Sequence, residues 1–253
     1  MNINLSPLNG RLIGASVPRP NASGALAGHA AGEPFAKLVH NHLVELFPGN
    51  TYSQFEYLNS LYLSHPDAIT FRQRYELIKS VPLAFLLDRG EAPTVAWNKN
   101  NQYIEKQNDT ADSLIFNKNI ANIIDIKTTS TSKNGQPPNI ISAYKLATMC
   151  KLMLDNNDFS SFDIIYIGID WEEKGPSLKC TDISIRGLFN TNPQRLYINW
   201  AAALQIQFHV DSLDQTYKGS IEQWCNDYLR SYLSSARKRI TTMQTKFIDP
   251  FIT

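Results

Sequence analysis

Two short isoleucine-rich runs in the middle of the chain place the strongest constraint on its fold. The runs cover residues 112–116 (DSLIF) and 120–127 (IANIIDIK), and Asn117-Lys118-Asn119 joins them. Short runs rich in β-branched residues, separated by a few turn-forming residues, are typical of a β-hairpin. We therefore predict two antiparallel strands here, with a tight turn between them.

Helix and strand signals occur on both sides of this hairpin in the sequence. Helical patterns cover four segments: Pro34 to about Phe47, parts of 52–90, Ser142 to about Leu154, and Ser220 to a point before Pro250. Apolar runs predict strands at 162–170 (FDIIYIGID) and 178–185, whereas residues 200–210 (WAAALQIQFHV) fit either a helix or a strand. Together these signals predict an α/β fold, in which a central mixed β-sheet is flanked by helices.

Three further segments have distinct sequence features: an N-terminal segment, a polar segment in the middle and a C-terminal segment. Residues 1–33 include a stretch rich in Gly, Ala, Ser and Pro, and we expect an irregular N-terminal arm there. Residues 128–138 (TTSTSKNGQPP) contain no large apolar side chain and are predicted to form a loop. Residues 220–248 open with a capping-box pattern and are predicted to form a long C-terminal helix. No segment has the composition of a linker, so we expect residues 1–253 to form a single domain.

The composition excludes several classes of protein. The 253 residues are 43% hydrophobic and 19% charged, which is typical of a globular chain and leaves no large share for disorder. The net charge of +1 excludes a wholly basic surface, so any site for a polyanion must be local. The three widely spaced cysteines suit neither a disulfide framework nor a metal knuckle, and no run approaches the roughly 20 apolar residues of a membrane span. We therefore expect a cytoplasmic protein with no membrane partner.

Two windows without acidic residues offer such a local site. The first separates Asp125 from Asp155, and the second runs from Ile183 to Val210. Their cations are Lys127, Lys133, Lys145, Lys151, Arg186 and Arg195. A few such cations are enough to attract phosphate groups. A chain with few charges also contains acid-free windows by chance, but we favour a positively charged groove.

The hairpin carries the residues that best suit catalysis. Side chains alternate along a strand, so Asp125 and Lys127 share one face. If Lys118-Asn119 forms a two-residue turn, Asp112 lies directly opposite Asp125, whereas a three-residue turn without a bulge places it on the other face. Two carboxylates at that distance repel each other unless a cation lies between them. The hypothesis therefore requires a two-residue turn.

Asp112, Asp125 and Lys127 suit metal-assisted hydrolysis of a phosphodiester. Magnesium prefers oxygen ligands, and one or two carboxylates with waters and a substrate phosphate supply them. The metal polarises the phosphoryl oxygen, while a lysine holds or deprotonates the attacking water and offsets negative charge. The simpler interpretation is that the aspartates are turn or edge residues and that the lysine is a solvated cation.

Several longer blocks resemble a known family, the HincII/HindII group of type II restriction endonucleases. The blocks are GHAAGEPF (28–35), QNDTAD (107–112), DIKT (125–128), QPPNIISAYKLA (136–147), YINWAAALQIQFHV (197–210) and LDQ (213–215). They occur in order from about residue 12 to residue 248. The group belongs to the PD-(D/E)xK nucleases, and here Ala111 stands where the general motif has proline. The proline is no metal ligand, so its absence leaves the predicted site intact.

The resemblance implies a restriction-endonuclease-like core and a homodimer that binds double-stranded DNA. It implies that Asp112 and Asp125 bind Mg²⁺, that the main-chain carbonyl of Ile126 completes the site, and that Lys127 is catalytic. It also implies cleavage at the centre of GTYRAC, which leaves blunt ends with 5′-phosphate and 3′-hydroxyl groups. A bacterial host would then need a cognate DNA methyltransferase.

The resemblance also assigns residues to DNA binding. Asn199 corresponds to the residue that reads the outer guanine, Asn139 to one that faces the inner base pairs, and Gln136 to a side chain that wedges into the stacked bases. Tyr197 and Lys133 are assigned to DNA binding as well. Amides can donate and accept at once, as such readers must, but Asn139 and Asn199 also suit helix caps before Ile140 and Trp200. The sequence departs from the group nearby, at Thr129 and Pro137, which affects the flanks of the target more than the chemistry.

Two other functions remain open at this point. One is a PD-(D/E)xK nuclease of repair or of a mobile element, which cuts DNA by its structure. The other is a DNA-binding module that retains the fold without catalysis. The complete set of Asp112, Asp125 and Lys127 argues against the second alternative, and the amide readers argue against the first.

Overall fold

The computed structural model describes residues 3–20, 28–68, 70–87, 110–131, 137–201 and 204–252. Its helices are α1 (Pro7–Leu12), α2 (Gly28–Leu46), α3 (Gln54–Leu63), α4 (Phe71–Ile78), α5 (Val81–Leu87), α7 (Ala143–Asn156) and α8 (Ile221–Met243). Its strands are β1 (Ser16–Pro18), β2 (Thr51–Tyr52), β3 (Ser113–Asn117), β4 (Ile120–Ser130), β5 (Asn139–Ser142), β6 (Phe162–Lys174), β7 (Ser177–Gly187), β8 (Ile198–Asn199) and β9 (Gln205–Gln207). None of the helices in these ranges is long and apolar enough to cross a membrane.

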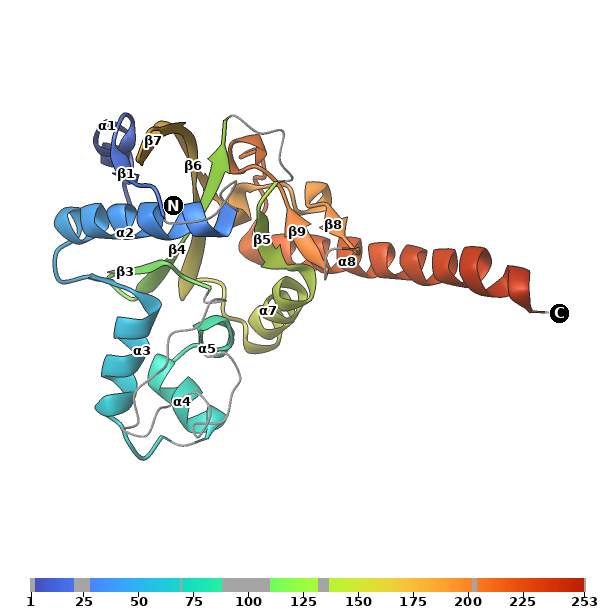
Figure 1. The fold of residues 1–253 in the computed structure, drawn as a ribbon. Coiled ribbons are helices and arrows are strands. Elements are labelled where there is room, and N and C mark those ends of the chain that lie inside the picture. The colour runs from blue at the N-terminus through green and yellow to red at the C-terminus, as the bar shows by residue number, and fades with distance from the viewer. Residues whose placement is uncertain are drawn as a thin grey trace.

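A six-stranded sheet forms the centre of the fold, in the order β1-β7-β6-β4-β3-β2 (Figure 1). The pairing of β4 with β6 is parallel, and every other neighbouring pair is antiparallel. The predicted mixed α/β fold is therefore confirmed. A second sheet has the order β5-β9-β8, and its strand β5 leads directly into α7.

Each face of the large sheet carries its own apolar core, because alternate residues of β4 and β6 point to opposite sides. Ile124 and Ile126 pack on one face with α1 and α2, which lies across the sheet in Figure 1. Ile123 and Tyr166 pack on the other face with α5, α7 and the first part of α8. The central strands β4 and β6 are thus covered on both sides, as parallel pairing requires.

Several predicted elements are confirmed with small changes in their bounds. The hairpin and the strands after residues 162 and 178 form as expected, and Ser142 caps α7 by accepting a hydrogen bond from the Lys145 N–H. Ser220 and Gln223 form the expected capping box at the start of α8. The α-helix ends at Met243 and continues as a π-helical turn, Gln244–Ile248, before Pro250. Within 52–90, the described residues form α3, α4 and α5 as predicted.

Three predictions about local structure were wrong. Residues 1–33 are not an irregular arm in the described part, because residues 7–12 form α1, 16–18 pair with β7, and α2 begins at Gly28 rather than at Pro34. Thr128–Ser130, which were predicted to begin a loop, instead continue the pairing of β4 with β6. The strand partners of β1 and of the end of β4 are distant in the sequence, and local composition does not reveal them.

The structure also bears on the alternative interpretation of Asn139 and Asn199 as helix caps. Asn139 and Asn199 precede no helix: Asn139 begins β5, and Asn199 ends β8. Residues 200–210, which fitted either a helix or a strand, contain β9, and this strand pairs with β8 in antiparallel fashion. The capping interpretation of both asparagines is therefore excluded, and their side chains need another explanation.

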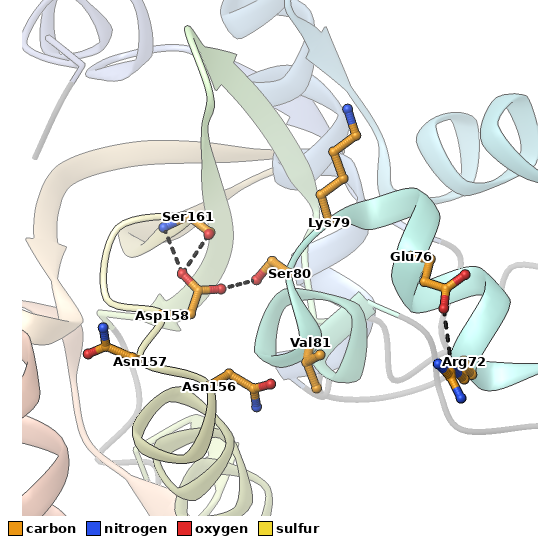
Figure 2. Close-up of a pocket in the computed structure, with 9 residues that line it drawn as sticks. All are labelled: Arg72, Glu76, Lys79, Ser80, Val81, Asn156, Asn157, Asp158 and Ser161. Atoms are coloured by element: carbon orange, nitrogen blue, oxygen red, sulfur yellow. Dashed lines mark hydrogen bonds and ion pairs between the residues drawn. The ribbon is translucent and has the colours of Figure 1, made fainter.

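A cleft of about 810 Å³ lies between α4, the start of α5 and the turn from α7 to β6 (Figure 2). The Asp158 carboxylate ties its walls together, since it accepts hydrogen bonds from the Ser80 hydroxyl and from the backbone N–H of Ser161. Ser161 directly precedes β6, whereas the predicted catalytic residues pair with positions further along that strand. At about 3.3 Å per residue, roughly 20 Å separates Phe162 from Gly168, so the cleft lies outside the predicted site.

Gly168 on β6 provides a test of the packing beside the predicted site. A β-carbon at this position would lie 2.7 Å from the Val210 Cβ and 2.6 Å from the Ser184 hydroxyl oxygen. Gly168→Ala should therefore lower the free energy of unfolding by about 1–3 kcal/mol through overpacking. The melting temperature should fall by about 2–4 °C for each kcal/mol. Guanidinium unfolding measures the first quantity.

Gly10→Ala is the matched control, because a β-carbon added at this position of α1 would meet nothing within 4 Å. Alanine is favoured over glycine in a helix by roughly 0.5–1 kcal/mol, so this variant should be slightly stabilised. Equal stability losses in the two variants would contradict the assigned packing around Gly168.

Candidate active site

The register of the hairpin brings the two predicted carboxylates together. Asn117 pairs with Ile120, so the turn contains two residues, and Lys118 adopts a left-handed φ of 56° within it. The pairing continues to Ser113 opposite Ile124, and the Asp112 N–H donates to the Ile124 carbonyl at 2.9 Å. Asp112 therefore lies opposite Asp125, as the two-residue turn requires.

Short polar contacts join Asp112, Asp125 and Lys127 on one face of the sheet. The Lys127 Nζ lies 2.8 Å from the Asp125 Oδ1, and the Ile126 N–H donates to the Asp112 Oδ2 at 2.6 Å. A hydrogen bond also links the two carboxyl groups to each other. The structure thus brings together the three residues that the sequence predicts to be catalytic.

Burial changes the proton affinities of these groups. Removal from water and, to a smaller extent, the negative charge of Asp112 raise the pKa of Asp125 to about 7, against the opposing effect of Lys127. The pKa of Asp112 is also raised, first because surrounding protein atoms exclude water from its carboxyl group, although part of the residue is exposed. Burial lowers the pKa of Lys127, but the attraction of Asp125 and Asp112 outweighs it and leaves the pKa raised. The carboxyl pair therefore holds a proton that a cation can replace.

The oxygen atoms at this site suit a hard divalent cation. The N–H and carbonyl of a strand residue point to the same edge, so the Ile126 carbonyl also points to the side of the strand on which Asp112 lies. The described residues contain no group of three or more His, Cys, Asp or Glu side chains that could hold a metal. Two carboxylates and a carbonyl, with water completing the coordination, match Mg²⁺ better than a metal that needs an all-protein shell.

Gln54 supports the segment that leads to Asp112 and was not predicted from the sequence. This buried side chain on α3 accepts hydrogen bonds from the N–H groups of Thr110 and Ala111, at 3.0 and 2.9 Å, and donates to the Leu87 carbonyl at 2.9 Å. Ala111 replaces the proline of the general motif and therefore has an N–H that needs an acceptor. Gln54 supplies that acceptor beside the predicted metal ligand.

The two predicted base-reading asparagines are connected through a third amide, Gln207. The Asn199 Nδ2 donates to the Gln207 Oε1, and the Gln207 Nε2 donates to the Asn139 Oδ1, both at 2.7 Å. All three lie on the three-stranded sheet. The sequence analysis missed Gln207, although its place in the YINWAAALQIQFHV block was an available signal.

Of the three other predicted DNA-binding residues, the structure describes Tyr197. Tyr197 is 69% exposed and directly precedes β8, so its ring is accessible to a ligand. Lys133 and Gln136 lie outside the described residues.

The whole chain resembles known restriction endonucleases. The family model described as "Restriction endonuclease HincII" matches residues 8–253. The type II restriction enzyme HindII of Haemophilus influenzae strain Rd is 49% identical over 244 residues, which cover 96% of this chain and 94% of that protein. The type II restriction enzyme HincII of Haemophilus influenzae is 48% identical over the same shares. Among solved structures, the NlaIV restriction endonuclease covers 95% of this chain and 91% of its own, with 6% identity and a TM-score of 0.40.

The matching relatives are type II restriction enzymes, so this chain is an enzyme of that class, a site-specific deoxyribonuclease that acts on double-stranded DNA. Within the class, it belongs to the HincII restriction endonuclease family. Membership of the family excludes the two alternatives left open by the sequence, a nuclease of repair or mobile elements and a non-catalytic module.

The raised pKa of Asp125 predicts how the stability of the metal-free protein depends on pH. Between the pKa of an unfolded aspartate, about 4, and about 7, the folded protein binds more protons at Asp125 than the unfolded chain does. Its free energy of unfolding should therefore fall as pH rises through this window. Asp125→Asn removes the titrating group, so wild type should lose stability relative to this variant between pH 5 and pH 8.

Guanidinium unfolding in EDTA at both pH values measures this difference. Saturating Mg²⁺ should restore the stability of wild type at pH 8 but not that of Asp125→Asn, because a bound cation stabilises the ionised carboxylates. A wild-type-to-variant difference that is the same at both pH values would contradict the raised pKa.

Proposed function

We propose that this enzyme hydrolyses double-stranded DNA at the centre of GTYRAC in a Mg²⁺-dependent reaction, and that it leaves blunt ends with 5′-phosphate and 3′-hydroxyl groups. The observation that carries the proposal is the contact of Asp112, Asp125 and Lys127 on one face of the hairpin. The resemblance of the sequence blocks to the HincII/HindII group supports the target sequence. The proposal treats residues 1–253 as one catalytic domain.

In this proposal, Asp112, Asp125 and the Ile126 carbonyl hold the metal. When bound, Mg²⁺ would polarise the scissile phosphate and lower the pKa of a coordinated water. Lys127 is protonated at neutral pH, since the adjacent carboxylates raise its pKa. Its ammonium group would therefore orient the attacking water and offset negative charge on the phosphate.

The three-stranded sheet carries the groups that read the bases. Asn199 reads the outer G·C pair and Asn139 faces the inner pairs, while Tyr197, Lys133 and Gln136 make further DNA contacts. Amide side chains match the combined donor and acceptor patterns of base edges. Their place on β5 and β8, rather than on a flexible loop, supports the proposal, because a rigid element positions a reader more accurately.

The partner of the enzyme is a second copy of itself. A palindromic target that is cut in both strands matches a dimer with two-fold symmetry. The first part of α8 packs on α7, whereas its second part projects from the molecule (Figure 1). Exposed apolar side chains line this projecting part and the turns that continue it after Met243: Leu233, Ile240, Met243, Phe247 and Phe251. We name these side chains the α8 surface and assign them to contact with the second copy.

A host cell that contains this enzyme needs protection of its own DNA. A cognate methyltransferase that modifies GTYRAC would supply it, and both enzymes would act in the bacterial cytoplasm. Cleavage of host DNA on expression without the methyltransferase, and survival with it, is the expected phenotype.

Single substitutions at the active site test the proposed roles. Asp125→Ala should abolish cleavage of a GTYRAC duplex but preserve specific binding in Ca²⁺, because binding depends on many other contacts. Lys127→Ala should also abolish cleavage, yet bind Mg²⁺ in a calorimetric titration. Rates on plasmid DNA and binding by gel shift are the measurements. Wild-type cleavage by Asp125→Ala would contradict the site, and loss of metal binding in Lys127→Ala would make that lysine structural.

Charges placed on the α8 surface test the dimer. The double variant Ile240→Asp with Phe247→Asp should be monomeric, because it places charges in a desolvated contact. Sedimentation velocity measures the mass, and plasmid digestion should change from linear to slow or nicked products. Thr242→Asp is the matched control on another side of the helix and should remain dimeric. A dimeric double variant would contradict the placement of the contact on α8.

A further inference from the structure

Hydrogen bonds join the reading amides into one chain with a single direction. Asn199 lies at the end of β8, Gln207 at the end of β9, and Asn139 at the start of β5. In order, the Asn199 nitrogen donates to the Gln207 oxygen, and the Gln207 nitrogen donates to the Asn139 oxygen. Both distances are 2.7 Å, which is short for an amide pair. We name these three side chains the amide chain.

The direction of the amide chain is fixed by the backbone. The Asn199 Oδ1 accepts a hydrogen bond from the Ala201 N–H at 3.1 Å, and an N–H can only donate. The Asn199 nitrogen must therefore point to Gln207, which must meet it with its oxygen. Gln207 then has only its nitrogen to offer Asn139. One backbone N–H thus determines the orientation of three amides that could otherwise rotate by 180°.

We propose that Gln207 is a positioning residue that makes Asn139 a hydrogen-bond donor toward DNA. Because Gln207 holds its oxygen, Asn139 directs its NH₂ group outward, and no other hydrogen bond within the described residues engages that nitrogen. Asn139 is also exposed, so the group is accessible to a base. The inference rests on the proposed function, from which it takes the position of Asn139 at the inner base pairs.

If Asn139 only donates a hydrogen bond to the base, the enzyme can accept either adenine or guanine at the purine position of GTYRAC. Adenine and guanine both present N7 as an acceptor in the major groove, so a donor at this position accepts either base. A freely rotating asparagine would do more, because it can donate to N7 of adenine and accept from its N6 amino group. Guanine has an acceptor, O6, in place of that amino group. By holding the Asn139 oxygen, Gln207 removes the contact that would favour adenine.

Gln207→Glu reverses the last link of the amide chain and tests the proposal. A carboxylate still accepts from Asn199 but cannot donate to Asn139. Asn139 must then turn its NH₂ group to residue 207 and direct its oxygen outward, where it accepts from adenine N6 and is repelled by guanine O6. We measure cleavage rates on two duplexes that differ only at the inner pairs, GTTAAC and GTCGAC. The GTTAAC:GTCGAC rate ratio should rise at least about tenfold over that of wild type.

Two further variants separate this effect from charge and from structure. Gln205→Glu adds the same charge two residues away on β9, so it should weaken binding of both duplexes alike and leave their rate ratio unchanged. Gln207→Met removes the link without a charge, frees Asn139 to rotate, and should raise the ratio by less than Gln207→Glu does. Melting temperatures confirm that each variant is folded. A constant ratio in both Gln207 variants, or an equal rise in Gln205→Glu, overturns the proposal.

A measurement without DNA keeps the inference distinct from the proposed function. In ¹⁵N-edited NMR spectra of the free protein, Gln207→Met should shift the side-chain amide signals of both Asn139 and Asn199, whereas the side-chain amide signal of Asn226 on α8, which donates to the Glu222 carbonyl, should stay in place. If wild type cuts neither duplex but these signals shift, the proposed target fails and the amide chain stands. Unchanged Asn139 and Asn199 signals in Gln207→Met overturn the amide chain whatever the enzyme cuts.

Discussion

The two-residue turn at Lys118-Asn119 fixes the hairpin register, and the active site depends on that register. One extra residue in the turn would move Asp112 to the opposite face of the sheet, away from Asp125. The turn has its effect because β4 cannot slide: it pairs in parallel with β6 over ten positions and is buried on both faces. A turn at the edge of the hairpin therefore positions two carboxylates several residues away.

Placing these carboxylates together costs stability, which the surrounding structure offsets in part. Asp125 is only 8% exposed, and burial beside Asp112 raises its pKa to about 7. Lys127 supplies one positive charge, and the Ile126 N–H stabilises Asp112. Gln54 fixes the backbone before Asp112 with hydrogen bonds that local sequence does not supply. The negative charge that Lys127 leaves uncompensated favours binding of a cation. The same burial that destabilises the metal-free protein therefore promotes metal binding.

Local signals predicted the fold where local interactions determine it. The hairpin, the Ser142 cap and the Ser220 capping box depend on residues a few positions apart, and all three were predicted correctly. The prediction failed where a partner distant in the sequence determines the local structure. Strand β1, for example, forms through its pairing with β7. Gln54 and Gln207 were missed for the same reason, since a glutamine has no local signature of the distant groups it will contact. The contact of Asp112, Asp125 and Lys127 could be predicted because alternation along one hairpin already places the three side chains on one face.

The reading sheet and the active site are joined by a short chain of contacts. Asn139 begins β5, and β5 ends at Ser142, which caps α7. Lys145, in the first turn of α7, donates to the hydroxyl of Thr110, two residues before Asp112. In the proposed complex, a base that displaces Asn139 would therefore also strain β5, and through it the start of α7 and the segment that carries Asp112. Because packed elements shift as units rather than deform continuously, this connection offers a route by which a wrong base disfavours the catalytic geometry as well as binding.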